Sequence, residues 1–497
     1  MSRSVDSNIK SLLVSELCNT INRVLVVQAS GRSVSGDRLF GYIQALSIAA
    51  SGCLRYSAVS GMVYVFGGRK WEPVGDEERG LDSRYYSIVN KAAWEVLKRC
   101  SDGVRDSDLL AGESKFGKAI TEGAMECVMD ESPCVIGFRN GVWDFSDPLN
   151  PVRHSFEERL GIRSIRDYDY DSSRGCVRWE RFLSNALSSG DIETLQCFFG
   201  LGVLPRTMLG HSVEKMLWLV GSGGNGKSTC LDVLEYVYGG DLFSHASLPT
   251  LLDTNIISRM LGTSPIIGCR YNRCDEIQLK DITGRTDMLK RLCSADHVEY
   301  RRIKGNAMSS NEVPFLVFSM NKVPTSRHTD PALLRRLLIV RFGYSVKAED
   351  MNTSLYNELC LEAPGIWNWC VEGYRKLVER GFLFRRSMDN DMEQRKMMIA
   401  SGQQMEVWLQ DEGLTPQGTK RMQKPYRVML STLYDRYCDW CKASDIEMDC
   451  DSAYTFGRIM SGGSKARSGL GFTKRRAANG MYFEVYSDNN IDYGIQK

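Results

Sequence analysis

The sequence lacks an excess of charge of either sign. Its 497 residues include 63 Lys and Arg and 61 Asp and Glu, for a formal net charge of +2. So weak an overall field attracts no acidic partner, and a nucleic acid would have to bind a local basic patch. Proline is sparse at 13 residues, and 43% of the residues are hydrophobic. This composition excludes a disordered or fibrous chain, and the length suggests about three globular domains.

Long apolar runs are also missing. The longest weakly polar stretch, Leu39 to Leu54, is interrupted by polar residues and is shorter than the roughly 20 residues that span a bilayer. Near the N-terminus, charged residues surround a short apolar stretch, which lacks the apolar centre of an export signal. Sixteen cysteines are scattered from Cys18 to Cys450 rather than gathered in a short framework. We therefore expect a cytoplasmic protein without a membrane segment.

Histidine is rare, and the pattern of a zinc site is incomplete. The five histidines are isolated in the sequence. Cys438 and Cys441 form a single pair near Cys450, but no fourth Cys or His completes a zinc set. We interpret the cysteine pair as part of a helix core, and we expect no metal other than Mg²⁺.

We expect the first 205 residues to form two regions. Residues 1–135 combine a strand-like Met62 to Phe66 with helical spacing from Tyr86 to Leu97, which indicates a small α+β module. Residues 136–205 begin with Asn140-Gly141 between hydrophobic runs, a dipeptide typical of a tight hairpin. A helical stretch from Val177 to Gly200 follows.

A phosphate-binding loop is predicted in the segment from Met216 to Gly240. A short apolar strand is followed by a glycine-rich loop that matches G-x-x-x-x-G-K-[ST] and then by helical spacing up to Tyr238. Glycines allow backbone N–H groups to surround phosphate oxygens, Lys227 would neutralise the β and γ phosphates, and Ser228 would bind Mg²⁺. We expect ATP contacts from Gly221, Ser222, Gly223, Gly224, Asn225, Gly226, Lys227, Ser228 and Thr229.

Hydrolysis further requires carboxylates, and Asp275-Glu276 is the candidate pair. Asp275 would hold Mg²⁺ through water, and Glu276 would activate the attacking water. The preceding segment, Ile266 to Cys274, is apolar in its first half but polar in its second, which is unusual for a central strand. The alternative is an acidic solvated turn.

Two further elements follow along the chain. Asn321 ends the apolar strand that begins at Phe315, where its amide could hydrogen-bond a γ-phosphate or the lytic water. It could also be an ordinary turn residue. Arg335 and Arg336 directly precede another strand, and an arginine there could reach across a subunit boundary to stabilise charge on the transferring phosphoryl group. The sequence leaves the choice between the two open, with a preference for Arg336 because it lies nearer the strand.

The chain resembles a superfamily 3 helicase of the AAA+ group in the order of four elements: the phosphate loop, the acidic pair, Asn321 and the paired arginines. More narrowly, the chain resembles the phage and plasmid primase-helicase C-terminal family that includes the poxvirus primase-helicase. Asn140 to Asp144 and Glu362 to Trp369 resemble that family's flanking segments. The resemblance implies an α/β fold with an AAA+ P-loop ATPase core at 206–385, a helical collar at 136–205 and a helical, winged-helix-like region at 386–497. It also implies a ring, usually a hexamer, around single-stranded DNA.

The resemblance places a DNA-gripping hairpin between Leu289 and Met308. We expect Arg301, Arg302 and Lys304 to contact the phosphodiester backbone, with Gly305-Asn306 at the tip. The family usually has a small-Gly-Gly-Asp turn before this hairpin, whereas this chain has Ser294-Ala295-Asp296. The alternative is a basic solvated surface.

The C-terminal region has a basic patch of its own. No acidic residue occurs from Ser452 to Phe483, whereas six basic residues do. Helical spacing from Tyr426 to Lys442 and from Ala453 to Met460, followed by strands around Asn479-Gly480, predicts a winged helix. The alternative is a basic lid on the ATPase. Within the patch, we expect Lys474, Arg475 and Arg476 to bind DNA.

The sequence thus favours an ATP-dependent replicative DNA helicase of a virus, phage or plasmid. Its expected partners are single-stranded and forked DNA, further copies of the chain, and a primase or polymerase acting in trans. Two alternatives remain. One is a DNA-packaging or remodelling motor with the same ATP chemistry, and the other is a non-enzymatic DNA-binding initiator in which the loop binds ATP as a switch. Stimulation of ATP hydrolysis by single-stranded DNA separates the first hypothesis from these two.

Overall fold

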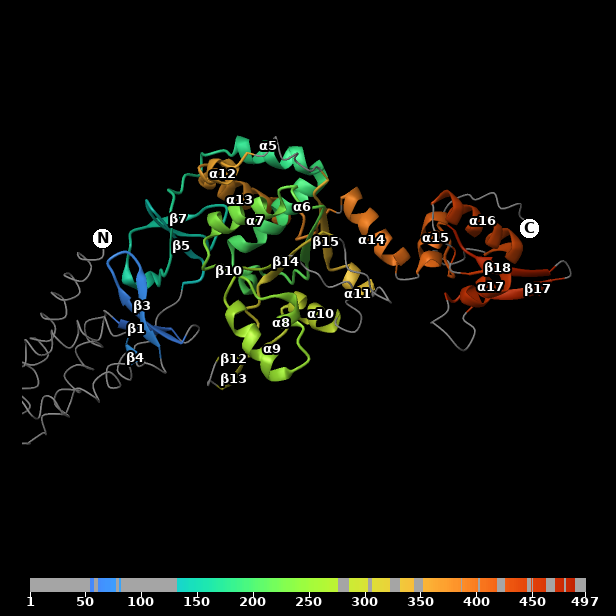
Figure 1. The fold of residues 1–497 in the computed structure, drawn as a ribbon, viewed down its shortest axis with the longest axis horizontal. Helices are drawn as coiled ribbons and strands as arrows, with labels where there is room; N and C mark the ends of the chain where they lie inside the picture. Colours follow the sequence, from blue (N-terminus) through green and yellow to red (C-terminus); the bar gives the residue numbers. More distant parts are fainter. Residues whose placement is uncertain are drawn as a thin grey trace, which may run out of the picture.

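The structure is a mixed α/β fold with several sheets, one of them parallel, which confirms the α/β class (Figure 1). This computed structural model describes residues 54–57, 61–76, 80–81, 132–275, 286–302, 306–321, 331–343, 352–385, 387–400, 403–417, 425–444, 448, 450–461, 470–477 and 480–487. Among them, no helix is both long and apolar enough to cross a membrane. The predicted helix from Tyr86 to Leu97 lies outside the described residues.

A parallel sheet of five strands forms the centre of the molecule, in the order β10-β11-β14-β9-β15. Strands β9, β14 and β15 are largely apolar runs, as expected of strands covered on both faces. The bounds are β9 Met216–Val220, β10 Phe243–Ser244, β11 Tyr271–Cys274, β14 Phe315–Met320 and β15 Leu337–Arg341. The predicted strands at 217–220 and 315–318 are confirmed.

Alternating residues of these strands face two separate cores. Leu217 and Leu219 belong to the core shared with helices α6, Ser189–Gly200, α7, Lys227–Tyr238, and α13, Ala363–Glu379. Trp218 faces the opposite core, which contains α8, Leu248–Leu251, and α10, Thr286–Ser294. Between them in sequence lie α9, Ile256–Thr263, and the 3-10 turn η4, Ser264–Ile266. Figure 1 shows helices on both sides of the sheet.

Strand β11 is formed by the second, polar half of the segment from Ile266 to Cys274, whose composition is unusual for a central strand. Ile266 ends a 3-10 turn, and Tyr271–Cys274 pairs with β14. Asn272 is fully buried, but its amide accepts from Ser244 Oγ (2.9 Å) and Ala246 N (2.9 Å) and donates to Ala246 O (2.9 Å). Because these bonds satisfy its polar atoms, burial in a central strand carries little penalty.

Helices α6 and α13 approach closely because glycines lie at their contact. A Cβ on Gly200 would come within 2.3 Å of Tyr374 N, and one on Gly373 within 2.1 Å of Gln196 O. Along α13, Trp367 is fully buried, with its ring centroid 5.1 Å from those of both Phe145 and Tyr238. Trp367 is therefore a packing residue of this core.

A small mixed sheet packs on this helix, with strands in the order β7-β6-β5-β8. The predicted hairpin at Asn140-Gly141 is confirmed, joining β5, Val135–Phe138, to β6, Gly141–Asp144. The sheet is completed by β7, Val152–His154, and β8, Ile165–Arg166, and α5, Val177–Ala186, follows. A four-stranded antiparallel sheet precedes it: β1 Leu54–Ser57, β2 Met62–Phe66, β3 Trp71–Asp76 and β4 Gly80–Leu81.

The hairpin expected between the acidic pair and Asn321 is present. Strands β12, Val298–Arg301, and β13, Ala307–Ser310, pair antiparallel, with Arg301 opposite Ala307. Ala295 adopts a φ of 53° in the turn before it. This left-handed conformation usually favours glycine, so Ala295 takes it at a small energetic cost.

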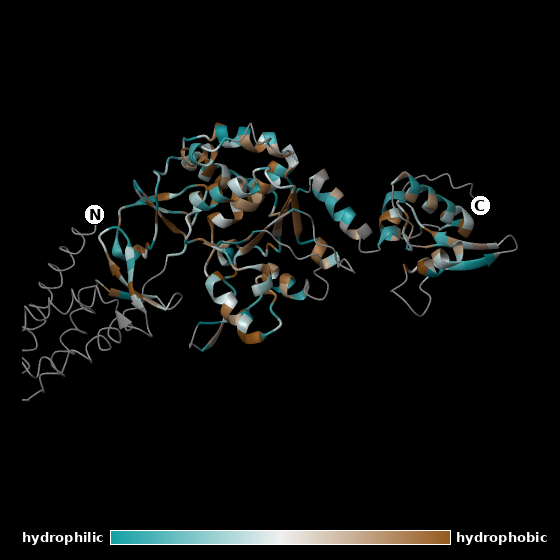
Figure 2. Cartoon of the chain, in the orientation of Figure 1, coloured by the Kyte–Doolittle hydropathy of each residue, from teal (hydrophilic) through white to brown (hydrophobic). Residues whose placement is uncertain are grey.

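The C-terminal part has its own hydrophobic core, containing Trp408 and Tyr437. Helix α14, Met388–Ala400, connects it to the central sheet, and the strands run β16-β18-β17 (Figure 1). Figure 2 shows β17 as strongly hydrophilic. The elements are α15 Gln404–Glu412, β16 Tyr426–Met429, α16 Leu430–Ala443, α17 Ala453–Ser461, β17 Thr473–Ala477 and β18 Gly480–Val485.

One helix start in this part was predicted incorrectly. Residues 426–429 form a strand rather than the first turn of a helix, because they pair with β18 and bury Val428 in the C-terminal core. The helix begins at Leu430. The second predicted helix and the strands around Asn479-Gly480 are confirmed.

Candidate nucleotide-binding site

The glycine-rich loop joins β9 to the first turn of α7. Gly224 and Gly226 have φ of 72° and 88°, which side-chain-bearing residues rarely adopt. A Cβ on Gly221 would come within 2.4 Å of Phe342 O. Gly226 is the N-cap of α7, and among the described residues no side chain caps this helix. The N–H groups and positive end of a 12-residue helix are therefore directed at the loop, an arrangement that binds anions.

Lys227 lies across this loop. Its Nζ donates to Gly221 O at 2.5 Å, to Asn225 Oδ1 at 2.9 Å and to Ser222 O at 3.3 Å. Burial lowers the pKa of the Lys227 ammonium from its ordinary value. Asn225 is itself held by its Nδ2, which donates to Phe342 O at 3.2 Å. The ammonium is thus positioned over the loop, while the neighbouring Ser228 is exposed.

Asp275 directly follows β11 and is held by Arg273 of that strand. Arg273 Nε lies 2.7 Å from Asp275 Oδ2, and the side chain of Asp275 is 42% exposed. The same guanidinium contacts two carboxylates of α7, Asp232 at 2.7 Å and Glu235 at 3.2 Å. Arg273 therefore ties the acidic strand to the helix that begins at the phosphate loop. Glu276 lies outside the described residues.

Asn321 lies at the same edge of the sheet. It is exposed and directly follows β14, which is hydrogen-bonded to β9 on one side and to β11 on the other. In this register Met320 is opposite Val220, and Cys274 is opposite Phe318. Since parallel strands end at a common edge, the phosphate loop, Asn321 and Asp275 are brought to one side of the sheet.

Arg335 and Arg336 lie at the opposite end of the strands, where the parallel strands begin. They follow α11, Pro331–Leu334, and precede β15, whose first residue Leu337 is opposite Met216 at the start of β9. Arg336 is buried: its Nη2 lies 2.7 Å from Glu214 Oε2 and donates to Ser294 Oγ at 3.0 Å. The side chain of Arg335 is 62% exposed and lies 3.5 Å from the same carboxylate. Neither arginine is brought to the phosphate loop of its own chain.

A cavity of about 540 Å³ adjoins the phosphate loop, and sequence reasoning missed it. It is formed where α5 and α12, Leu355–Cys360, meet Gly224, Asn225, Gly226 and Thr229 of the loop. Phe182 of α5 contacts the loop, since a Cβ on Gly226 would lie 3.0 Å from its ring. Helix α5 was predicted, but its contact with α12, almost 180 residues later, has no local sequence signal. Other lining side chains are Arg178, Arg181, Asn185, Tyr356 and Leu359.

The predicted DNA-contacting residues are spread over two surfaces. Arg301 and Arg302 at the end of β12 are half-buried, and Arg302 lies against the turn between β1 and β2, since its Nη1 is 2.3 Å from the position of a Cβ on Gly61. Lys304 lies outside the described residues. On β17, Arg475 pairs with Glu484 at 3.2 Å, Arg476 is exposed, and Lys474 is half-buried against α17.

Comparison with known proteins places one family on this site. Residues 219–336 match a family described as "Family of unknown function (DUF5906)", a segment that includes the phosphate loop, Asp275, Asn321 and both arginines. No curated protein matches the chain.

Among solved structures, the A-form apo structure of the NrS-1 C-terminal region is similar with a TM-score of 0.44 and 12% identity, covering 87% of this chain and 95% of that chain. A further apo structure of the same region has a TM-score of 0.39 and 11% identity, with the same coverage.

Proposed function

We propose that this chain is an AAA+ ATPase of superfamily 3 helicase type, which acts in DNA replication of a virus, phage or plasmid. The observation that carries the proposal is the position of Lys227 in an anion-binding loop at the start of α7, with Asp275 and Asn321 at the same sheet edge. Strand β14 lies between β9 and β11. Asn321, which follows β14, therefore comes between the phosphate loop after β9 and Asp275 after β11. This arrangement suits hydrolysis of a terminal phosphate better than nucleotide binding alone.

The donor set fits ATP with Mg²⁺. Ser228 offers an exposed hydroxyl and Asp275 a partly exposed carboxylate, both hard oxygen ligands. When bound, Mg²⁺ would neutralise charge on the phosphates. Arg273 positions this carboxylate through Asp275 Oδ2. Lys227 would exchange its loop carbonyls for the β and γ phosphates, Asn321 would hydrogen-bond the terminal phosphate or the lytic water, and Glu276 would activate that water.

The cavity beside the loop is suited to the base and ribose. It adjoins the loop at Gly224 and Gly226, and Phe182 and Tyr356 supply aromatic surface. We expect Phe182→Ala to raise the KM for ATP about 10-fold with kcat little changed, because loss of stacking on a base costs roughly 1–3 kcal/mol. Steady-state ATPase kinetics measure both values. The control is Tyr454→Ala, which removes an exposed aromatic side chain far along the chain. An unchanged KM in Phe182→Ala would contradict binding of the base in this cavity.

The opposite-edge position of the arginines supports a site shared between subunits. An arginine at the amino end of β15 cannot reach the phosphate loop of its own chain, which lies beyond the carboxyl end of β9. In a ring, the same arginine would face the site of the neighbouring copy. The exposed Arg335 is suited to this role, whereas Arg336 is buried among partners of its own chain. We therefore assign the trans role to Arg335, contrary to the sequence-based preference for Arg336.

DNA is the proposed substrate of the motor, and the β12–β13 hairpin its contact. We expect Arg302→Ala with Lys304→Ala to abolish fork unwinding and stimulation of ATPase by single-stranded DNA, while basal hydrolysis survives because the nucleotide site is untouched. ATPase rates with and without a single strand, beside a fork-unwinding assay, measure this. Normal unwinding by the double variant would refute the hairpin's role, and no stimulation of the unaltered chain would favour the packaging-motor or initiator alternatives.

The C-terminal basic strand provides the matched contrast. We propose that α16, α17 and the β17–β18 strands act as a winged helix that loads DNA. Alanine at Lys474, Arg475 and Arg476 should weaken DNA affinity and reduce the log–log salt slope by up to about 0.7 per lost contact with a single strand. Unwinding at saturating DNA should be largely retained. An unchanged salt slope would favour a lid on the ATPase instead.

A further inference from the structure

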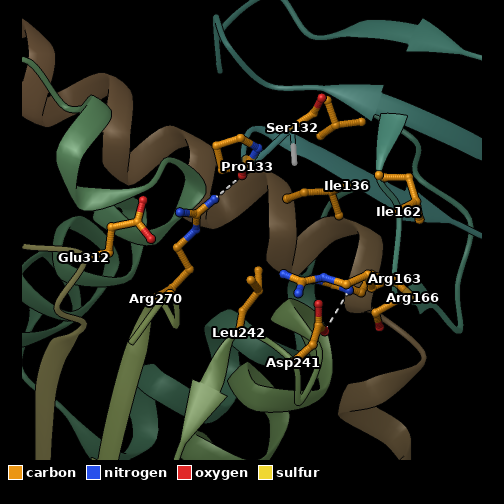
Figure 3. A pocket seen from close by; sticks show the side chains of 15 residues that line it. Ser132, Pro133, Ile136, Ile162, Arg163, Arg166, Asp241, Leu242, Arg270 and Glu312 are labelled. Atoms are coloured by element: carbon orange, nitrogen blue, oxygen red, sulfur yellow. Dashed lines mark hydrogen bonds and ion pairs between the residues drawn. The ribbon is translucent and has the colours of Figure 1, made fainter. Parts of the chain in front are cut away.

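A second pocket lies at the opposite end of the parallel strands from the phosphate loop. It has a volume of about 200 Å³ and is enclosed between the β5–β8 sheet and the segments that lead into β10, β11 and β14 (Figure 3). Leu242 and Arg270 immediately precede β10 and β11, and Glu312 lies three residues before β14. The pocket is therefore at the amino ends of the parallel strands, whereas the candidate nucleotide site is at their carboxyl ends.

Arginine dominates this pocket. Figure 3 shows Arg270 on one side and Arg163 and Arg166 on the other. Asp241 and Glu312 are the lining carboxylates. Asp241 is already engaged, since its Oδ1 lies 2.9 Å from Arg166 Nη1.

Arg270 is a buried cation without a matching carboxylate. It is 6% exposed, and its Nη2 donates to the carbonyl of Pro133. Across the part of the chain that the structure describes, no carboxylate forms an ion pair with it, and its Nε has no hydrogen-bond partner. The same holds for the Nε of Arg166, whose side chain is 3% exposed. Burial lowers the pKa of Arg270 to about 10, so the guanidinium is still charged at neutral pH.

Buried charge without a counter-ion is costly, and guanidinium N–H groups match the oxygens of phosphate in a bidentate way. We propose that this pocket binds a phosphate group, held by Arg270 and Arg166 with Arg163 at the rim. Because the lining residue Glu312 follows the β12–β13 hairpin, which is the proposed DNA contact, we take the ligand to be a phosphodiester of the nucleic-acid strand. The phosphate site itself is independent of the proposed function; the choice of a nucleic-acid strand rests on it.

The position of Glu312 gives such a contact a consequence. Glu312 follows the β12–β13 hairpin, and its carbonyl accepts a hydrogen bond from Gly268 N at 3.1 Å. Gly268 lies two residues before Arg270 in the chain. A strand phosphate held by Arg270 would thus lie at the base of the hairpin whose tip is proposed to grip DNA. The pocket would extend the DNA path from the hairpin to the β5–β8 sheet.

The test compares three variants of the full chain in binding a fluorescent single-stranded oligonucleotide over a range of salt. Arg163→Gln should weaken binding about 5- to 10-fold and lower the log–log salt slope by about 0.7, as for one lost contact with a single strand. Arg270→Lys should weaken binding with little change in slope, because the charge remains while the bidentate geometry is lost. Arg159→Gln is the matched control, since this exposed arginine lies four residues from Arg163 and outside the pocket; it should bind like the unaltered chain.

Calorimetric titration with inorganic phosphate forms the second arm. The phosphate loop is common to all variants, so differences between them isolate the pocket. Equal oligonucleotide binding by all variants, with phosphate binding still weakened in Arg163→Gln and Arg270→Lys, would overturn the nucleic-acid ligand. Equal binding of both probes by all variants would overturn the pocket as a phosphate site. Failure of the ATPase proposal would be seen separately, as an absence of ATP hydrolysis by the unaltered chain and by the control Arg159→Gln.

Discussion

Replacing Lys227 with alanine is expected to reduce ATP hydrolysis by about 10²–10³-fold, the range found when one group that stabilises developing charge is removed. The Lys227 ammonium lies over the loop and is held by three acceptors within it, Gly221 O, Ser222 O and Asn225 Oδ1. No other lysine or arginine occurs in the loop from Gly221 to Thr229. Release of inorganic phosphate from ATP with Mg²⁺ measures the effect.

The matched control is Lys442→Ala, which removes a lysine whose side chain is 75% exposed on α16. It should hydrolyse ATP at the unaltered rate. Thermal melting of both variants checks that Lys227→Ala remains folded, since its loss leaves the buried Asn225 without one of its partners. A folded Lys227→Ala protein with near-normal hydrolysis would show that the loop is not the catalytic site.

The Arg335→Ala variant is expected to lose ATP hydrolysis by about 10³-fold or more, the contribution known for arginines supplied to a neighbouring active site. Its melting temperature should stay close to that of the unaltered chain, because its side chain is mostly exposed and exposed ion pairs contribute little stability. Mixing Arg335→Ala with Lys227→Ala should restore part of the activity, since some interfaces then combine an intact loop with an intact arginine. ATPase rates of mixtures over a range of ratios measure this.

Arg336→Ala provides the comparison. Arg336 is buried and contacts Glu214, Ser294 and Ala332 of its own chain. Its removal should destabilise the fold by about 3 kcal/mol, as when one partner of a buried pair is lost. Melting curves therefore separate the two arginines. If Arg335→Ala and Lys227→Ala both assemble but their mixtures recover no activity, the shared site is refuted.

Some of the candidate site could be predicted because its residues are contiguous. The phosphate loop occupies nine consecutive positions between a strand and a helix, and local backbone geometry at Gly224 and Gly226 depends mainly on those residues. Asn321 follows an apolar strand that periodicity alone identifies. By contrast, the polar sequence of β11 is unusual for a central strand, because the partners of Asn272 and Arg273 come from β10 and α7.

Other features depend on residues far apart in the chain. The cavity beside the loop combines α5 with α12, and the arginine pocket combines Pro133 and Arg166 with Arg270. Periodicity cannot show that Arg336 is buried and Arg335 exposed, since both precede the same strand. Both lie near Glu214, and the bond of Arg336 to Ser294 of α10 comes from a distant segment. Tyr426 to Met429 formed a strand because β18 lay beside it, although its spacing was typical of a helix.

The glycine-rich loop between a strand and a helix, the hairpin at Asn140-Gly141 and the order of candidate residues therefore follow from local sequence, where neighbouring residues set backbone conformation and apolar periodicity. The α/β class was expected from the family resemblance that these segments carry. The choice between Arg335 and Arg336, the cavity beside Phe182 and the second pocket around Arg270 were decided by tertiary structure. Burial and ion pairing depend on which distant segments meet, and elements such as α5 and α12 come together only when the two cores on either side of the sheet are packed.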